Sequence, residues 1–200
     1  MSYIKFRFEN LWRKIKQPYH HRNFEIDFIL NYIHDISWTI PSNDNRRLGI
    51  LDVGATDSLL MFEILKRGYM PIGIDLRPYH VTLPKNSCFY RGDITTPNLK
   101  EFFKKYPIYM AVALSTIEHI GLPCYGGPII SNGDRLAIEN IHSILDDNGL
   151  FIITIPTKIW QSASGRGYTP KEFYTLIEGL FKVFEITQRG GQICAALTKL

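Results

Sequence analysis

The sequence predicts an α/β fold, a doubly wound and mostly parallel sheet with helices on both of its faces. Short apolar runs alternate with amphipathic stretches of helical length from residue 48 onward, and strands alternating with helices favour a parallel sheet. The last two apolar runs are joined by Gly190-Gly191, which is typical of an antiparallel hairpin. The hydrophobic content of 45% and charged content of 21% are those of a globular protein.

Each expected element has a local reason. Strands are predicted at the apolar runs 48–53, 70–74, 89–90, 109–114, 150–155, 181–188 and 192–198. Helices are predicted at 58–67, 99–106, 134–145 and 169–178. Gly68 ends the first of these, Asp134 is expected to cap the third, and Thr169 with Glu172 forms a capping box for the fourth.

Residues 1–47 are predicted to form a helical extension that packs on a body at 48–200. Amphipathic helices are expected at 3–16 and 24–36. Residues 1–22 hold six basic side chains and one acidic one, a charge of +5, so the rest of the +4 chain sums to −1. Basic charge confined to one segment disfavours a nucleic-acid-binding body. The alternatives for 1–22 are a cap on the body, a peripheral membrane contact or a partner contact.

Several function classes are disfavoured by what the sequence lacks. The sequence contains no run of about 18 apolar residues, so no transmembrane segment is expected. The charged N-terminal residues do not resemble a secretory signal. We therefore expect a cytoplasmic protein. The three cysteines, Cys88, Cys124 and Cys194, are widely separated and form no CxxC pair, which argues against a metal site and against a disulfide framework.

Polar residues follow the predicted strands at the edge where open parallel sheets bind ligands. Asp52 could meet an amino group, and Gly54 allows a sharp turn with close backbone approach. Asp57 or Ser58 could cap the following helix, whose N-terminus suits a carboxylate. Asp75 ends the second strand and could accept both hydroxyls of a ribose.

The third strand ends with a second acidic turn. Asp93 could receive an exocyclic amine of adenine, and Ile94 could pack on the base. Each strand-end acid is ordinary by itself. Their order and spacing together predict a nucleotide-like ligand.

These motifs resemble those of class I S-adenosylmethionine-dependent methyltransferases. The resemblance rests on ILDVGATDSLLMFEILKRGYMPIGIDLRPY, YRGDI, VALSTIEHIGL and LDDNGLFIITIP, and it extends from about residue 48 to residue 200. It implies a seven-stranded Rossmann-like methyltransferase fold with S-adenosylmethionine as cofactor. It also implies that Asp52 and Gly54 lie at the methionine part of the cofactor, Asp75 at the ribose, Asp93 and Ile94 at the adenine, and Ser115 and Glu118 beneath the sulfonium.

One departure from the family pattern leaves two interpretations open. Members usually carry D-x-G-x-G-x-G, but Thr56 and Ser58 stand at the second and third glycine positions. Because a β-branched residue narrows a close approach, the chain is either a subfamily with a different loop or one that has lost cofactor binding. The same replacement argues against a dinucleotide site of the G-x-G-x-x-G type.

The acceptor side is predicted from the loops that follow the fourth and fifth strands. His119 is the candidate general base, because imidazole titrates near neutral pH; the alternative is a packing role. Tyr125, Trp160, Arg166 and Tyr168 are the candidate acceptor-binding residues, since aromatic side chains and arginine suit a sugar or an anion.

Two functions from different classes follow from these residues. The first is methyl transfer to a small molecule or a glycan, the latter because the motifs also resemble an uncharacterised methyltransferase-like group associated in part with surface-polysaccharide biosynthesis. The second is a non-catalytic binding or scaffolding protein recruited through the basic N-terminal helix.

Overall fold

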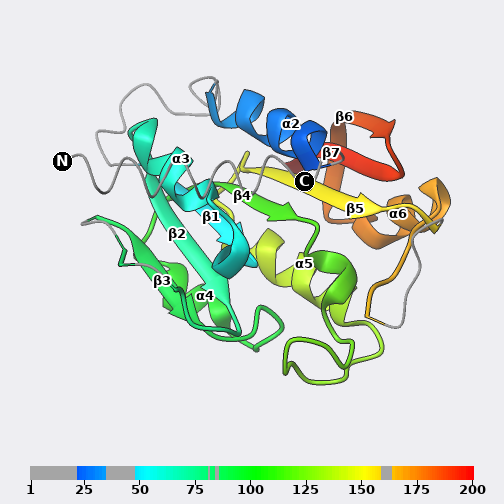
Figure 1. The fold of residues 1–200 in the computed structure, drawn as a ribbon, viewed down its shortest axis with the longest axis horizontal. Helices are drawn as coiled ribbons and strands as arrows, with labels where there is room; N and C mark the ends of the chain where they lie inside the picture. Colours follow the sequence, from blue (N-terminus) through cyan, green and yellow to red (C-terminus); the bar gives the residue numbers. More distant parts are fainter. Residues whose placement is uncertain (1–21, 35–47, 81, 84–85, 159–163) are drawn as a thin grey trace.

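A seven-stranded sheet in the order β3-β2-β1-β4-β5-β7-β6 forms the centre of the computed structural model (Figure 1). The structure describes residues 22–34, 48–80, 82–83, 86–158 and 164–200, and for residues 22, 23 and 57 the backbone alone. The expected helix at 3–16 lies outside the described residues. The strands are β1 Gly49–Val53, β2 Met70–Asp75, β3 Cys88–Arg91, β4 Ile108–Leu114, β5 Leu150–Pro156, β6 Phe181–Arg189 and β7 Gln192–Lys199.

The pairing of the strands confirms the predicted sheet. The pairs among β1 to β5 are all parallel, whereas β7 is antiparallel to both β5 and β6. Gly190 and Gly191 connect β6 to β7 with φ of 59° and 79°. Positive φ at both turn positions is what a tight hairpin with right-handed twist requires.

Helices cover both faces of the sheet (Figure 1). One face carries α2 Arg22–His34 and α3 Leu60–Lys66, and the other carries α4 Leu99–Phe103, α5 Gly133–Ile144 and α6 Pro170–Ile177. Every residue of β1 and β5 is buried. Because successive side chains of a strand point to opposite faces, such continuous apolar runs are expected only for strands covered on both sides.

Local sequence signals set most helix ends, with two differences. The capping box of α6 is confirmed: Thr169 Oγ1 accepts from the Glu172 N–H at 3.2 Å, and the Glu172 carboxylate accepts from the Thr169 N–H at 2.8 Å. The expectation that Asp134 caps α5 is wrong, because α5 begins at Gly133 after Asn132. The helix expected at 99–106 ends at Phe103.

The helix α2 belongs structurally to the body of the molecule. Its buried side chains Phe28, Ile29 and Ile33 pack in one cluster with residues of β1, β4 and β7. None of the helices described is both long and apolar enough to span a bilayer.

Candidate functional site

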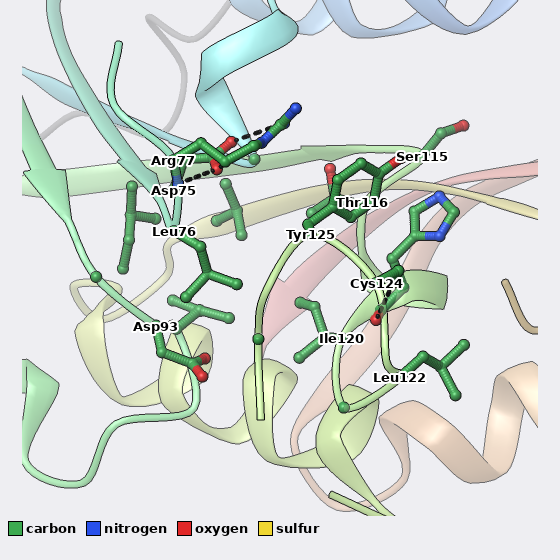
Figure 2. A pocket seen from close by; sticks show the side chains of 18 of the residues that line it. Asp75, Leu76, Arg77, Asp93, Ser115, Thr116, Ile120, Leu122, Cys124 and Tyr125 are labelled. Carbon is green, nitrogen blue, oxygen red and sulfur yellow. Dashed lines mark hydrogen bonds and ion pairs between the residues drawn. The ribbon is translucent and has the colours of Figure 1, made fainter. Parts of the chain in front are cut away.

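A pocket lies at the carboxyl ends of β1, β2, β3 and β4, where the strand order reverses between β1 and β4. Figure 2 shows Asp75, Leu76 and Asp93 along one side of it and Ser115, Leu122 and Cys124 along the other. Open α/β sheets bind ligands at this switch point. The predicted residues Gly54, Asp75, Asp93, Ile94, Ser115, His119 and Tyr125 all line the pocket.

Gly54 allows the chain to leave β1 and turn tightly beside β4. Its φ is 83°, its N–H donates to the Ile74 carbonyl oxygen at 2.9 Å, and a Cβ atom there would lie 2.4 Å from Thr116 Oγ1. Both the positive φ and the close approach require glycine.

Thr56, at the second glycine position of the family pattern, does not line the pocket. Its hydroxyl donates to the carbonyl oxygen of Arg77 at 3.2 Å, and its N–H donates to Asp75 Oδ2 at 3.1 Å. The β-branched side chain is therefore accommodated by bonding to the segment after β2. The residue that directly precedes α3 is Leu59, so neither Asp57 nor Ser58 stands at the N-cap position as predicted. Ser58 Oγ nevertheless accepts from the Leu60 N–H at 2.9 Å, and the side chain of Asp57 lies outside the described residues.

Asp75 is held by backbone and side-chain donors at the end of β2. Its Oδ1 accepts from the Arg77 N–H at 2.9 Å, and the Arg77 guanidinium pairs with the carboxylate at 3.3 Å. The guanidinium also lies 4.7 Å from the centre of the Tyr125 ring. Both oxygens of this carboxylate are therefore engaged, Oδ1 by the Arg77 N–H and Nε, and Oδ2 by the Thr56 N–H and the Arg77 guanidinium. Arg77 is a neighbour that the sequence motif did not reveal.

Asp52 is a buried carboxylate whose oxygens lack hydrogen bonds of normal geometry. Its side chain is fully buried, and neither oxygen has a partner. Burial raises the pKa of Asp52 to about 7; the nearby Ser58 hydroxyl lowers the pKa and the charge of Asp75 raises it. An unmatched buried acid is costly. Asp52 itself does not line the pocket, although the next two residues of the chain, Val53 and Gly54, do.

Apolar side chains line the centre of the pocket. Ile94 is buried below the loop after β3, and Leu76 and Ile120 face the same space. Asp93 Oδ1 accepts from the Thr95 N–H at 2.8 Å, which fixes the carboxylate at the rim. An apolar wall with one acid at its edge fits a flat heteroaromatic ring with an exocyclic amine.

Ser115 follows β4 in an unusual backbone conformation. Its φ is 45°, a left-handed value that is uncommon for a residue other than glycine. The Ser115 N–H donates to both the carbonyl oxygen and the hydroxyl of Thr154, at 3.1 and 2.9 Å. The neighbouring strand β5 therefore holds the strained residue in place.

His119 has a defined tautomer. Its Nδ1 faces the carbonyl oxygen of Ser164; because a carbonyl oxygen can only accept, Nδ1 carries the hydrogen in the neutral ring. Nε2 then has the lone pair, 3.8 Å from Glu118 Oε1. Glu118 is buried and does not line the pocket, whereas His119 does, so Glu118 lies on the side of His119 away from the pocket. Nε2 is therefore the ring nitrogen that can accept a proton.

The four predicted acceptor residues have different positions. Tyr125 is 55% exposed at the pocket rim and lies edge-on to His119, with ring centres 5.4 Å apart. Tyr168 is buried and its hydroxyl donates to Asp134 at 2.8 Å, and Arg166 donates to the Ile120 carbonyl oxygen at 2.6 Å. Neither Tyr168 nor Arg166 lines the pocket. Trp160 lies outside the described residues.

Asp134, in the first turn of α5, bonds to two residues of the segment before α6. Its Oδ2 accepts from Tyr168 and lies 3.7 Å from the Arg166 guanidinium. Burial and the neighbouring Asp134 charge raise the pKa of the Tyr168 hydroxyl. Tyr168 and Arg166 therefore stabilise the segment between β4 and α5 through Asp134 and the Ile120 carbonyl oxygen, and neither side chain lines the pocket. Within the described ranges, no cluster of His, Cys, Asp and Glu has the composition of a metal site.

Comparisons with known proteins agree on the fold. The sequence matches no protein-family model, and no curated protein is significantly similar to it. Solved structures are similar in fold. NodS, an N-methyltransferase from Bradyrhizobium japonicum in complex with S-adenosylhomocysteine, is 11% identical with a TM-score of 0.63 over 96% of this chain and 97% of that one.

Two further structures show the same likeness. A TehB-like S-adenosylmethionine-dependent methyltransferase from Corynebacterium glutamicum is 18% identical, with a TM-score of 0.62 over 98% of this chain and 96% of that one. The 1,6-didemethyltoxoflavin-N1-methyltransferase of Burkholderia thailandensis, solved with its acceptor and S-adenosylhomocysteine, is 13% identical, with a TM-score of 0.60 over 97% and 89%. The chain therefore has the class I methyltransferase fold that its motifs predict, whereas the subgroup suggested by those motifs stays a prediction.

Proposed function

We propose that this chain is an S-adenosylmethionine-dependent methyltransferase that acts on a small-molecule or glycan acceptor. The observation that carries the proposal is the Asp52 carboxylate, which is fully buried next in the chain to the pocket-lining residues Val53 and Gly54 and has no hydrogen-bond partner for either oxygen. A ligand with an ammonium group would complement this acid, whereas an uncharged ligand would leave the cost of its burial uncompensated.

The residues that line the pocket fit the remaining parts of the same cofactor. The vicinal hydroxyls of a ribose would replace the contacts of the Arg77 guanidinium with the Asp75 oxygens. Leu76, Ile94 and Ile120 form an apolar wall for the adenine. Asp93 stands at the rim, where it can accept from an exocyclic amine. Solved methyltransferases of the same fold contain S-adenosylhomocysteine, which supports this assignment.

When bound, S-adenosylmethionine supplies a methyl group activated by a positively charged sulfur. The chain's own task is to align the acceptor and remove its proton. We assign proton removal to Nε2 of His119, which lies 3.8 Å from Glu118 Oε1. Tyr125, half exposed beside His119, offers an aromatic surface that suits a sugar ring or another planar acceptor.

One observation favours the second candidate, a non-catalytic binding protein. The Arg77 guanidinium pairs with the Asp75 carboxylate at 3.3 Å, and that carboxylate is the group assigned to the ribose. A chain that no longer bound a nucleoside could retain this ion pair for stability alone.

Calorimetric titration with S-adenosylhomocysteine separates the two functions. We expect binding by the unaltered chain, and a loss of about tenfold or more in Asp52→Asn because a charge-assisted contact is removed. Asp147→Asn, which alters a fully exposed acid, should bind normally. Absence of binding heat at millimolar ligand would contradict the methyltransferase proposal.

Transfer of labelled methyl groups from S-adenosylmethionine to a panel of amines, phenols and sugar derivatives tests the acceptor. His119→Gln should lower the rate of transfer by about 10²–10⁴-fold while its affinity for S-adenosylhomocysteine stays near that of the unaltered chain. Binding without transfer to any acceptor would favour the non-catalytic function.

A further inference from the structure

The acid assigned to the ribose is engaged by a side chain of the same pocket. Asp75 and Arg77 both line the pocket, and the Arg77 side chain turns back onto the Asp75 carboxylate (Figure 2). Arg77 Nε lies 3.3 Å from Oδ1 and Nη2 lies 3.4 Å from Oδ2. The guanidinium therefore donates to both oxygens at once, which is the two-point contact that arginine makes with carboxylates.

Two backbone groups form the rest of the donor set of Asp75. The Arg77 N–H donates to Oδ1 at 2.9 Å, and the Thr56 N–H donates to Oδ2 at 3.1 Å. Both N–H groups belong to the turns that follow β1 and β2, so their positions do not depend on the rotamer of the Arg77 side chain. The guanidinium is carried by a flexible stem and is the part of the donor set that can leave.

The number of acceptor sites on Asp75 makes the guanidinium and a ribose alternatives. A carboxylate has about four lone-pair sites. Two of them are taken by the backbone N–H groups and two by the guanidinium. Vicinal hydroxyls of a ribose would also donate one hydrogen bond to each oxygen, so they can bind Asp75 only in place of the guanidinium.

Leaving Asp75 has a cost for Arg77. The side chain of Asp75 is only 7% exposed and that of Arg77 is 30% exposed, so the ion pair compensates for the burial of the acid as long as no ribose is bound. The ring of Tyr125, in the loop after β4, lies 4.7 Å from the guanidinium and stabilises the same position through a cation–π contact. A ligand that takes Asp75 must offset the loss of this ion pair.

We propose that Arg77 is an internal competitor of the cofactor: its guanidinium holds the two oxygens of Asp75 until the ribose displaces it, and this exchange lowers the affinity of the pocket for the cofactor. This inference rests on the proposed function. It gives Arg77 a role in release as well as in binding, because a guanidinium that returns to Asp75 favours the departure of S-adenosylhomocysteine after methyl transfer.

Calorimetry and thermal unfolding of the full chain test this role together. Arg77→Met keeps an unbranched apolar stem and removes the guanidinium. We expect the affinity for S-adenosylhomocysteine to rise about three- to tenfold, because the ribose no longer displaces an ion pair. The Tm without ligand should fall by about 2–4 °C, because Asp75 loses that pair. S-adenosylhomocysteine has no positive sulfur, so removing a cation from the pocket does not relieve a repulsion with the sulfonium.

Arg67 provides a matched control. Its guanidinium pairs with Glu63, and the two side chains are 24% and 11% exposed, which is close to the exposure of the Arg77–Asp75 pair. Arg67 does not line the pocket. Arg67→Met should lower the Tm by a similar amount and leave the affinity for S-adenosylhomocysteine within about twofold of that of the unaltered chain.

A double-variant cycle identifies the group for which Arg77 competes. Asp75→Asn removes the negative charge and one of the two acceptor oxygens, so the guanidinium is held less firmly. In that background Arg77→Met should change the affinity for S-adenosylhomocysteine by less than about twofold. A gain as large as in the Asp75 chain would mean that Arg77 acts through another group, and this would overturn the inference.

The inference is also overturned if Arg77→Met binds S-adenosylhomocysteine no more tightly than the unaltered chain. A fall in Tm without a gain in affinity would make the ion pair a stabilising contact alone. If the unaltered chain does not bind S-adenosylhomocysteine at millimolar concentration, the proposed function itself fails, and this inference with it.

Discussion

The N–H of Thr56 donates to Asp75 Oδ2 at 3.1 Å, so the loop after β1 is tied to the acid at the end of β2. This bond uses the backbone N–H, which a glycine would also supply, so the threonine keeps the contact with the acid assigned to the ribose. Its side chain is turned toward the carbonyl oxygen of Arg77 and away from the pocket.

Replacing Thr56 by glycine should therefore not improve cofactor binding. Thr56→Gly removes the hydroxyl bond and adds backbone freedom to the unfolded chain, so we expect a loss of about 1–2 kcal/mol in the free energy of unfolding. Affinity for S-adenosylhomocysteine should stay within about twofold. A marked gain in affinity would show that the threonine obstructs the pocket.

Gly54 and Gly68 form a matched pair for testing the turn after β1. Both have strongly positive φ, 83° and 89°, but an added Cβ meets Thr116 only at Gly54 and nothing within 4 Å at Gly68. Gly68→Ala should cost about 1 kcal/mol for its φ. Gly54→Ala should cost at least about 2 kcal/mol more and lower the affinity for S-adenosylhomocysteine, as denaturant titration and calorimetry can measure. Equal losses would mean that the turn tolerates a side chain.

Asp52 predicts how stability changes with pH. Its pKa is raised to about 7 from a model-peptide value of 3.8, so between these pH values the folded chain binds a proton that the unfolded chain has released. The stabilising contribution of Asp52 to the free energy of unfolding is fully present below about pH 4 and is lost as the pH rises through 7.

The measurement is urea unfolding at pH 5 and pH 8 for the unaltered chain and for Asp52→Asn. The difference in free energy of unfolding between the unaltered chain and the variant should decrease by a few kcal/mol from pH 5 to pH 8, by roughly 1.4 kcal/mol for each pH unit crossed below 7. A pH-independent difference would mean that Asp52 is ionised throughout. Ligand binding should reverse the trend, since an ammonium group favours the ionised acid.

Tyr168 should contribute to stability and not to cofactor binding. Tyr168→Phe removes the hydroxyl that donates to the buried Asp134, and the unpaired acceptor should cost about 1–3 kcal/mol. Tyr174→Phe alters a half-exposed tyrosine of α6 and should cost less than about 0.5 kcal/mol. Thermal unfolding compares the two variants. A loss of binding in Tyr168→Phe without a loss of stability would instead support the predicted contact with the acceptor.

Local patterns in the sequence were sufficient for most of the fold. The capping box of Thr169 and Glu172 formed as predicted because both partners lie within one helical turn. Asp134 was misassigned as the cap because α5 begins before it; one of its oxygens accepts from the adjacent Arg135 N–H, and the other accepts from Tyr168, 34 residues away. Contacts between distant segments leave no trace in the spacing of a single sequence.

For the acids at the strand ends, the sequence predicted the location and the tertiary structure decided the contacts. The sequence determined by itself that Asp52, Gly54, Asp75 and Asp93 gather at one edge, because parallel strands bring their carboxyl ends together. Only the tertiary structure decided that Thr56 turns away from the pocket, that Arg77 pairs with Asp75, and that Glu25 reaches Ser115 from 90 residues away. Side-chain direction and long-range hydrogen bonding depend on how α2 and the loops pack against the sheet, and that packing exists only in the folded chain.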